Sequence, residues 1–93
     1  MNLRVEWNEP KAKLNYAKHG VSFDLAKEVF SDPFAVGFVD DRQDYGEERL
    51  VMMGTVEGRL FYVVYTERAD AIRLISARRA TKNEQETYFK ENS

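Results

Sequence analysis

The stretch Ala71–Tyr88, AIRLISARRATKNEQETY, decides how the chain folds, because a strand in it passes almost directly into a capped helix. In its first half, the side chains at positions 72, 74 and 76 alternate with those at positions 73, 75 and 77, which is the period-two pattern of a strand in a sheet. Thr81 is followed three residues later by Glu84, a capping-box pattern in which hydroxyl and carboxylate each accept a backbone N–H at a helix start. The sequence therefore predicts a rigid junction that holds arginine side chains in place.

The rest of the chain supplies the elements that pack against this junction. Leu14 and Ala17 are expected to face the core from a first helix, which Asn8 caps and Gly20 ends. Strands are expected over 3–7, 34–39, 50–56 and 60–66, and a second helix over 23–30. We therefore predict one α+β domain over residues 1–93, with a small antiparallel sheet, helices packed on one face, and the order β-α-α-β-β-β-β-α.

The composition is that of an ordinary globular chain with few chemical options. Hydrophobic residues make up 43% of the 93 residues and charged residues 32%, which is enough apolar material for one modest core. The chain has no cysteine, which excludes disulfides, thiolate metal sites and a cysteine nucleophile. No apolar window approaches the length of a membrane span, so we expect a cytoplasmic protein without a membrane partner.

Charge is distributed unevenly along the chain. The net charge of −2 argues against a protein that coats nucleic acid indiscriminately. Residues 31–57 contain seven acidic and two basic side chains, whereas residues 68–82 contain five basic and one acidic. An anionic ligand is therefore expected at the second region, although a solvated surface is the alternative for any single charge.

Three motifs give the chain a family resemblance: EWNEPK at 6–11, NYAKHGVSF at 15–23 and ISARRATKNEQETY at 75–88. Together they resemble the BrnT family, the toxins of type II toxin–antitoxin modules, whose usual pattern is Trp-Asp-x-x-Lys, then Asn-x-x-Lys-His-Gly-Val-x-Phe, then Ile-Ser-x-Arg. Asn8 stands where the family usually carries aspartate. Asparagine replaces an aspartate that only caps a helix, but not one that is needed as a charge.

The resemblance implies a RelE-like fold and an endoribonuclease that cuts RNA and inhibits translation. It also implies neutralisation by a BrnA-like ribbon-helix-helix antitoxin, through which alone the complex contacts promoter DNA. No cofactor or metal is expected, and the acidic loop 40–48 lacks the pattern of a calcium loop. The alternative function is a catalytically weak module that holds the antitoxin and assists promoter autorepression, which Asn8 and the net negative charge keep open.

Metal-independent RNA cleavage needs a base for the 2′-hydroxyl, positive charge at the phosphorane and an acid for the departing 5′-oxygen. The single histidine excludes a two-histidine acid–base pair. The candidate catalytic residues are His19, Glu67, Arg73, Arg78 and Tyr88. Candidate RNA-binding cations, for which a solvated surface is the alternative, are Lys11, Lys13, Lys18, Arg79 and Lys82.

Three of the catalytic candidates have structural alternatives that the sequence leaves open. His19 suits acid–base chemistry, but a cation in the last turn of a helix also stabilises its C-terminus. Glu67 is a base if burial raises its pKa, or else an ion-pair partner of Arg68 or Arg73. Tyr88 either stacks a base or donates a proton, or it packs in the core.

The arginines are the stronger phosphate candidates, because a guanidinium offers a fork of donors that stays charged. If the strand runs regularly, Arg73 and Arg79 point to one face and Arg78 to the other. We therefore expect at most one of the neighbouring arginines to lie beside Arg73. A salt bridge with Glu84 is the alternative role for Arg78.

Overall fold

The computed structural model describes residues 3–42 and 46–93, so Asp44 of the acidic region lies outside the described residues. Along the chain the elements are β1 (Arg4–Glu6), α1 (Glu9–His19), α2 (Phe23–Ala26), the 3-10 helix η1 (Lys27–Ser31), β2 (Val36–Asp40), β3 (Arg49–Val56), β4 (Arg59–Arg68), β5 (Ala71–Arg79) and α3 (Lys82–Glu91). The α+β class expected from the sequence is confirmed. The expected second helix is α-helical only in its first turn and then tightens into η1.

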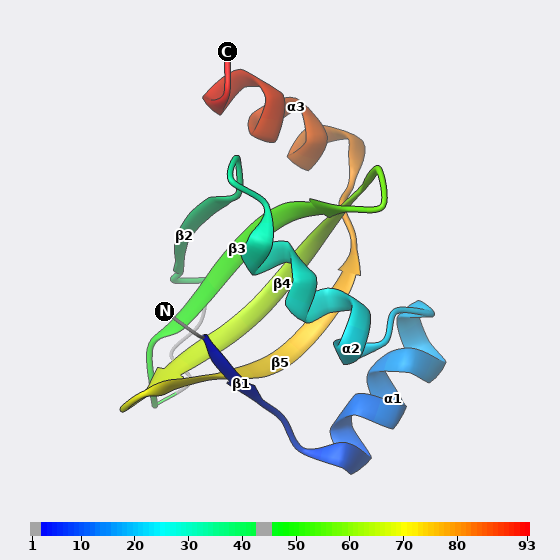
Figure 1. The fold of residues 1–93 in the computed structure, drawn as a ribbon, viewed down its shortest axis with the longest axis vertical. Coiled ribbons are helices and arrows are strands. Elements are labelled where there is room, and N and C mark those ends of the chain that lie inside the picture. Colours follow the sequence, from blue (N-terminus) through cyan, green and yellow to red (C-terminus); the bar gives the residue numbers. More distant parts are fainter. Residues whose placement is uncertain (1–2, 43–45) are drawn as a thin grey trace.

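The strands form one five-stranded sheet in the order β1-β5-β4-β3-β2. Neighbours from β2 to β5 are antiparallel, but β1 pairs with β5 in parallel. The prediction of a wholly antiparallel sheet is therefore wrong. After β1 the chain passes through α1, α2 and η1, which carry it across the sheet to β2 at the opposite edge. The first strand therefore stays beside the last one, β5 (Figure 1).

Helices cover both faces of the sheet, so the prediction that they pack on one face is also wrong. On the face that we call the helical face, α2 and η1 bury Phe23 and Val29 against β4 and β5. On the other face, Tyr88 of α3 joins a second apolar cluster with Val51 and Tyr62. Figure 1 shows α2 crossing in front of the sheet, α1 beside it, and α3 beyond one end. Within the described residues, no helix is long and apolar enough to cross a membrane.

Local capping fixes where the helices begin and end. The Asn8 side chain accepts a hydrogen bond from the backbone N–H of Lys11 at 3.0 Å, and Gly20 ends α1 with a φ of 70°. Thr81 and Glu84 form the expected capping box at the start of α3. The β3–β4 hairpin turns through Glu57 and Gly58, both at positive φ, as a tight two-residue turn requires.

A buried asparagine, rather than an apolar stripe, docks α1 onto the sheet. Leu14 is 70% exposed and Ala17 is also exposed, so the prediction that they face the core is wrong. Asn15 points inward instead, accepts a bond from the backbone N–H of Ala77 at 3.1 Å and donates to its carbonyl at 2.9 Å. It also donates to the carbonyl of Val21. The amide thereby pairs the backbone N–H and carbonyl of Ala77 at the edge of β5, at a position where β1 no longer pairs with β5.

Candidate functional site

A β-bulge in β5 decides which arginines share a face. Val64 pairs with Ser76 and Tyr65 with Leu74, so Ile75 is the extra residue of the bulge. Because one inserted residue reverses the alternation beyond it, the regular parity assumed from the sequence fails after Ile75. Arg73 and Arg78 consequently lie on the same face, opposite the helical face, and Arg79 lies on the helical face. We call the shared surface the arginine face.

The positions of the arginine side chains agree with this register. Arg73 pairs across the sheet with Thr66, which shares a side of β4 with Tyr62. The guanidinium of Arg78 lies over the Tyr62 ring, 4.1 Å from its centroid. The guanidinium of Arg79 lies instead 5.8 Å from the centroid of the Phe61 ring, and Phe61 belongs to the core of the helical face. The expectation that Arg73 and Arg79 point to one face and Arg78 to the other is therefore corrected.

Arg78 is held by a bidentate ion pair with Glu84 of α3, at 2.8 and 2.9 Å. Its Nη1 also donates to the carbonyl of Arg79 at 3.2 Å. The hydrogen bonds from Arg78 hold the pKa of Glu84 below its usual value, and Glu84 in turn raises the pKa of Arg78. The salt bridge considered as the alternative for Arg78 is thus present. Because both terminal nitrogens of Arg78 are already hydrogen-bonded, its contribution to the arginine face is a fixed positive charge and not a set of free donors.

Arg73 stands in contrast, because its guanidinium makes no hydrogen bond or ion pair with any residue that the structure describes. It is half-buried and extends from a strand that is paired on both sides. Arginine with open donors on a rigid strand is suited to bind a phosphate.

A second ion pair lies at the β2 side of the arginine face. Arg42 contacts the carboxylate of Asp40 with two nitrogens, at 2.8 and 3.0 Å. These hydrogen bonds lower the pKa of Asp40, whose side chain is only 2% exposed. Arg42 also acts electrostatically on Tyr62 and Arg78, which places its charge over the same surface.

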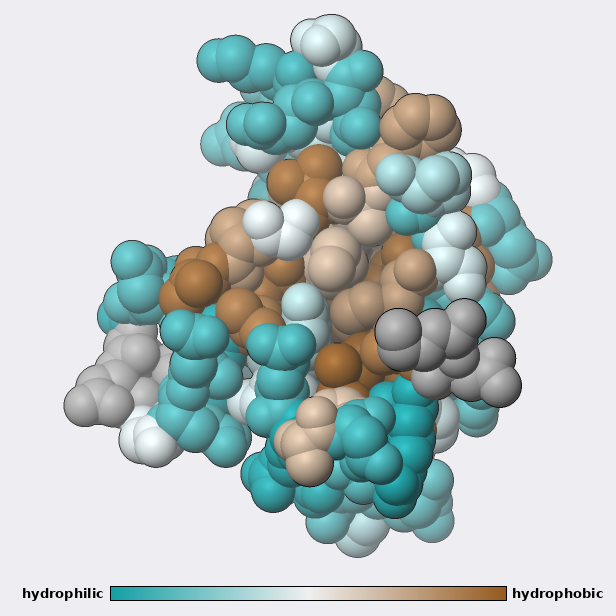
Figure 2. Space-filling model, turned by 60° about the vertical axis from the view of Figure 1, so that its left-hand side comes forward, coloured by the Kyte–Doolittle hydropathy of each residue, from teal (hydrophilic) through white to brown (hydrophobic). Residues whose placement is uncertain are grey.

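Tyr62 and Phe38 supply aromatic surface between these charges. Phe38 packs its edge against the Tyr62 ring, with 6.2 Å between centroids, and is itself 42% exposed. Burial raises the pKa of Tyr62, so its hydroxyl stays protonated at neutral pH. That hydroxyl makes no hydrogen bond within the described part of the chain. Figure 2 brings the β2 edge forward and shows apolar side chains gathered there below α3.

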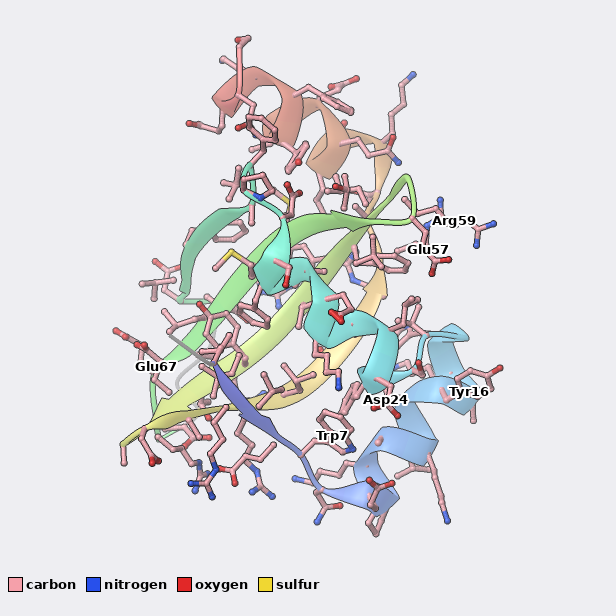
Figure 3. The ribbon with its side chains drawn as sticks, in the orientation of Figure 1. Trp7, Tyr16, Asp24, Glu57, Arg59 and Glu67 are labelled. Atoms are coloured by element: carbon pink, nitrogen blue, oxygen red, sulfur yellow. The ribbon has the colours of Figure 1, made fainter. Side chains whose placement is uncertain are left out.

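Of the acid–base candidates from the sequence, Glu67 lies on the face opposite Arg73. Glu67 follows Tyr65 on the helical side of β4, is exposed, and pairs with neither Arg68 nor Arg73. Figure 3 shows it at the end of the sheet opposite the β3–β4 hairpin. His19 closes α1, half-buried, and its ring makes no hydrogen bond among the described residues.

Tyr88 has a structural position. It is 5% exposed, and its hydroxyl donates a 2.6 Å hydrogen bond to Asp32. Burial alone would raise the pKa of Asp32, but bonds from Tyr88, Thr55 and the N–H of Phe34 outweigh it and lower that pKa. Burial and the bond to Asp32 raise the pKa of Tyr88. The pair ties α3 to the turn that follows η1, as the core alternative for Tyr88 anticipated.

The five candidate RNA-binding cations are exposed and dispersed. Lys11, Lys13 and Lys18 lie on α1, Arg79 at the end of β5 on the helical face, and Lys82 at the start of α3. Cavities in the described part of the chain lie on the helical side. One of about 600 Å³ runs between β1 and η1 past Val5, Trp7 and Phe30. Neither Arg73 nor Arg78 lines it.

Sequence reasoning missed the arginine face because its members come from separate strands. Arg42 and Arg49 fell in the region counted as acidic, and Phe38 and Tyr62 read as ordinary strand residues. Their only signal was alternation within each strand, which assigns a face but not a neighbour. Among residues 3–42 and 46–93, no group of three or more His, Asp and Glu side chains is arranged to hold a metal ion.

Comparison with known proteins identifies the family. A search of functionally curated proteins gives no match. The family model described as "Ribonuclease toxin, BrnT, of type II toxin-antitoxin system" matches residues 7–84, which is most of the chain and includes all three motifs except the ends of the first and last. The chain therefore belongs to the BrnT family of ribonuclease toxins of type II toxin–antitoxin systems.

Proposed function

We propose that this protein is a metal-independent endoribonuclease toxin that cleaves RNA on its arginine face and thereby inhibits translation in the cytoplasm. The observation that carries the proposal is the bulge at Ile75, which brings Arg73 and Arg78 to one face. Two guanidinium groups on one surface, that of Arg78 held by Glu84, provide the positive charge that a crowded phosphorane requires. Family membership supports the class of reaction.

In the proposed reaction the ribose 2′-hydroxyl gives up its proton to solvent water, its oxygen attacks the adjacent phosphorus, and the bond to the 5′-oxygen breaks. The products are a 2′,3′-cyclic phosphate and a free 5′-hydroxyl. We assign direct phosphate contact to Arg73, whose donors are open, and a positioning role to Arg78, whose donors are taken by Glu84. The protonated Tyr62 hydroxyl, next to Arg78, is the proposed proton donor to the departing 5′-oxygen.

The proposed partner is a BrnA-like ribbon-helix-helix antitoxin, which would supply the DNA contacts of a repressing complex. A RelE-like fold is proposed with it, supported by a small sheet that leaves charged side chains on one face. Asn8 does not weaken this proposal, because its side chain caps α1 through the N–H of Lys11. An aspartate there would accept the same bond.

The direct test incubates the purified protein with RNA in the presence of EDTA. We expect cleavage that leaves 2′,3′-cyclic phosphate ends and that is lost in Arg73→Gln. Intact RNA after prolonged incubation with folded protein would refute the proposal. If the same protein still bound its antitoxin without inhibiting growth when expressed alone, the binding-module alternative would replace it.

A further inference from the structure

A row of polar side chains crosses the arginine face at the end away from α3. Asp40 pairs with Arg49, and Thr66 pairs with Arg73. Arg49 lies across from Thr66, one position beyond the pair of Leu50 and Tyr65. The four strands β2 to β5 thus each contribute one side chain, in the order Asp40, Arg49, Thr66, Arg73.

Thr66 is the unexplained member of this row. The residue is 2% exposed, and its hydroxyl oxygen is buried without a hydrogen-bond partner in the described structure. Most buried polar side-chain atoms in proteins are paired, so an unpaired hydroxyl points to a ligand or an ordered water that would complete it. Its strand neighbours on this face, Val64 and Arg68, give its oxygen no bond.

The surroundings of Thr66 select an anion. Arg49 and Arg73 stand on the two adjacent strands, where side chains directly across a strand pair are about 5 Å apart at Cβ. The nearest carboxylate of the row, Asp40, is held by Arg42 on the outer side of Arg49. Glu67 projects from the helical side. A tetrahedral anion above Thr66 would therefore meet the guanidinium fork of Arg73, the positive charge of Arg49 and one hydroxyl.

An aromatic side chain lies within reach of this position. Phe38 precedes Asp40 by two residues on the same side of β2, and it pairs with Val51. It is therefore the diagonal neighbour of Arg49, at about 7–8 Å, which is comparable with the separation between a phosphate and its base in a nucleotide. The Phe38 ring is partly exposed and held against Tyr62. Aromatic rings in such positions stack unpaired bases.

We propose that Arg49, Thr66 and Arg73 form a subsite for one phosphate of single-stranded RNA, with Phe38 stacking the attached base. The subsite deepens the proposed function, on which it rests, by fixing where a nucleotide sits relative to Tyr62 and Arg78. Thr66 becomes accessible when the long side chains on either side of it rotate outward onto the phosphate. It then completes its hydrogen bonding by donating to a phosphate oxygen.

The test measures binding of a short single-stranded 2′-O-methyl RNA, which cannot be cleaved through the 2′-oxygen, by fluorescence anisotropy at several salt concentrations. We expect Arg73→Gln to weaken binding at least about tenfold and to reduce the salt slope by roughly 0.7–1. Thr66→Val should weaken binding by about fivefold, and Thr66→Ser should restore it. Phe38→Leu should weaken it by about fivefold with an unchanged salt slope.

The matched control is Arg59→Gln, which removes the same charge from an exposed arginine beside the β3–β4 hairpin (Figure 3). Its side chain belongs to the helical face, so binding should stay within about twofold of wild type. Equal affinity of wild type, Thr66→Val and Arg73→Gln, with unchanged circular dichroism, would overturn the subsite. If Thr66→Val fails to fold, Arg73→Gln against Arg59→Gln decides alone.

The two proposals fail separately. Cleavage of ordinary RNA with no difference in binding between Arg73→Gln and Arg59→Gln would remove the subsite and the phosphate contact assigned to Arg73, and would leave the ribonuclease activity. Selective binding of 2′-O-methyl RNA without cleavage of ordinary RNA would keep the subsite and remove the catalytic proposal.

Discussion

The two ends of β5 on the arginine face carry the same kind of side chain in opposite situations. At one end Arg78 is stacked on Tyr62 and bonded to Glu84, so α3 holds it in place. At the other end Arg73 has no partner in the described structure and stands beside the unpaired Thr66 hydroxyl. Two arginines on the same face therefore have different roles: the one bonded within the protein supports the site, and the one with open donors is suited to bind the ligand.

The largest effect is expected at Arg73, the arginine with open donors. We expect Arg73→Gln to lower kcat/KM for RNA cleavage at least about 100-fold, because it removes the open donors at the phosphate. Its folding stability should change little, since no hydrogen bond or ion pair within the described chain is lost. Steady-state cleavage and thermal melting measure the two effects. Arg59→Gln serves as the control, and equal loss of activity in both variants would contradict the assignment.

Tyr62→Phe separates stacking from proton donation at the held end. The ring remains to support Arg78 and Phe38, but the unpartnered hydroxyl is removed. We expect kcat to fall about 10- to 100-fold, with binding of 2′-O-methyl RNA nearly unchanged. Retention of full kcat would show that the proton donor lies elsewhere.

Glu84→Gln tests the held end through stability. The substitution removes the charge that Arg78 contacts and weakens the capping box, so we expect a loss of about 2 kcal/mol in the free energy of unfolding. Urea denaturation measures it. Because the pKa of Glu84 is depressed in the folded state, its contribution is present above the unfolded value near 4.5 and is lost as pH falls through the folded value. The variant should therefore lose less stability than wild type on acidification below about pH 4.5.

Tyr88→Phe extends the same test to the link between α3 and Asp32. We expect a cost of about 1–2 kcal/mol, because the substitution removes one bond to a charged acceptor that keeps its two from Thr55. The raised pKa of Tyr88 contributes stability below the unfolded value near 10, which is lost as pH rises through the folded value. Tyr88→Phe should lack that alkaline loss, as denaturation at pH 8 and above about pH 10 would reveal. A wild-type curve in the variant would contradict the structural role.

Sequence patterns correctly predicted the features of the fold that depend on local chemistry. The caps at Asn8 and Thr81, and the hairpin at Gly58, follow from hydrogen bonds and backbone angles within a few residues. The contrast between Arg73 and Arg78 did not follow, because it depends on one bulge residue, Ile75, that alternation alone does not reveal. Pairing across strands is non-local.

Docking of the first helix and strand was missed for a related reason. Helical periodicity predicts that apolar residues such as Leu14 face the core. The group that docks α1 is instead the polar Asn15, whose partner Ala77 lies far along the chain. The parallel pairing of β1 with β5 likewise connects the two ends of the sequence. An amide has no hydrophobic signal, so only the fold shows that it completes a strand edge.

The smallest expected effect belongs to Asn8→Asp, which restores the usual residue of the family. Like Arg78, Asn8 is bonded within the protein, because its side chain accepts a hydrogen bond from the N–H of Lys11 and caps α1. Asparagine and aspartate cap helices about equally, and the added charge at a helix N-terminus contributes only about 0.3–1 kcal/mol. We therefore expect cleavage within about twofold of wild type and a slightly higher melting temperature, whereas Asn8→Ala should lose about 1 kcal/mol of stability. A large gain in kcat for Asn8→Asp would move this position from the group that builds the fold to the group that acts on RNA, since capping alone gives no route to faster chemistry.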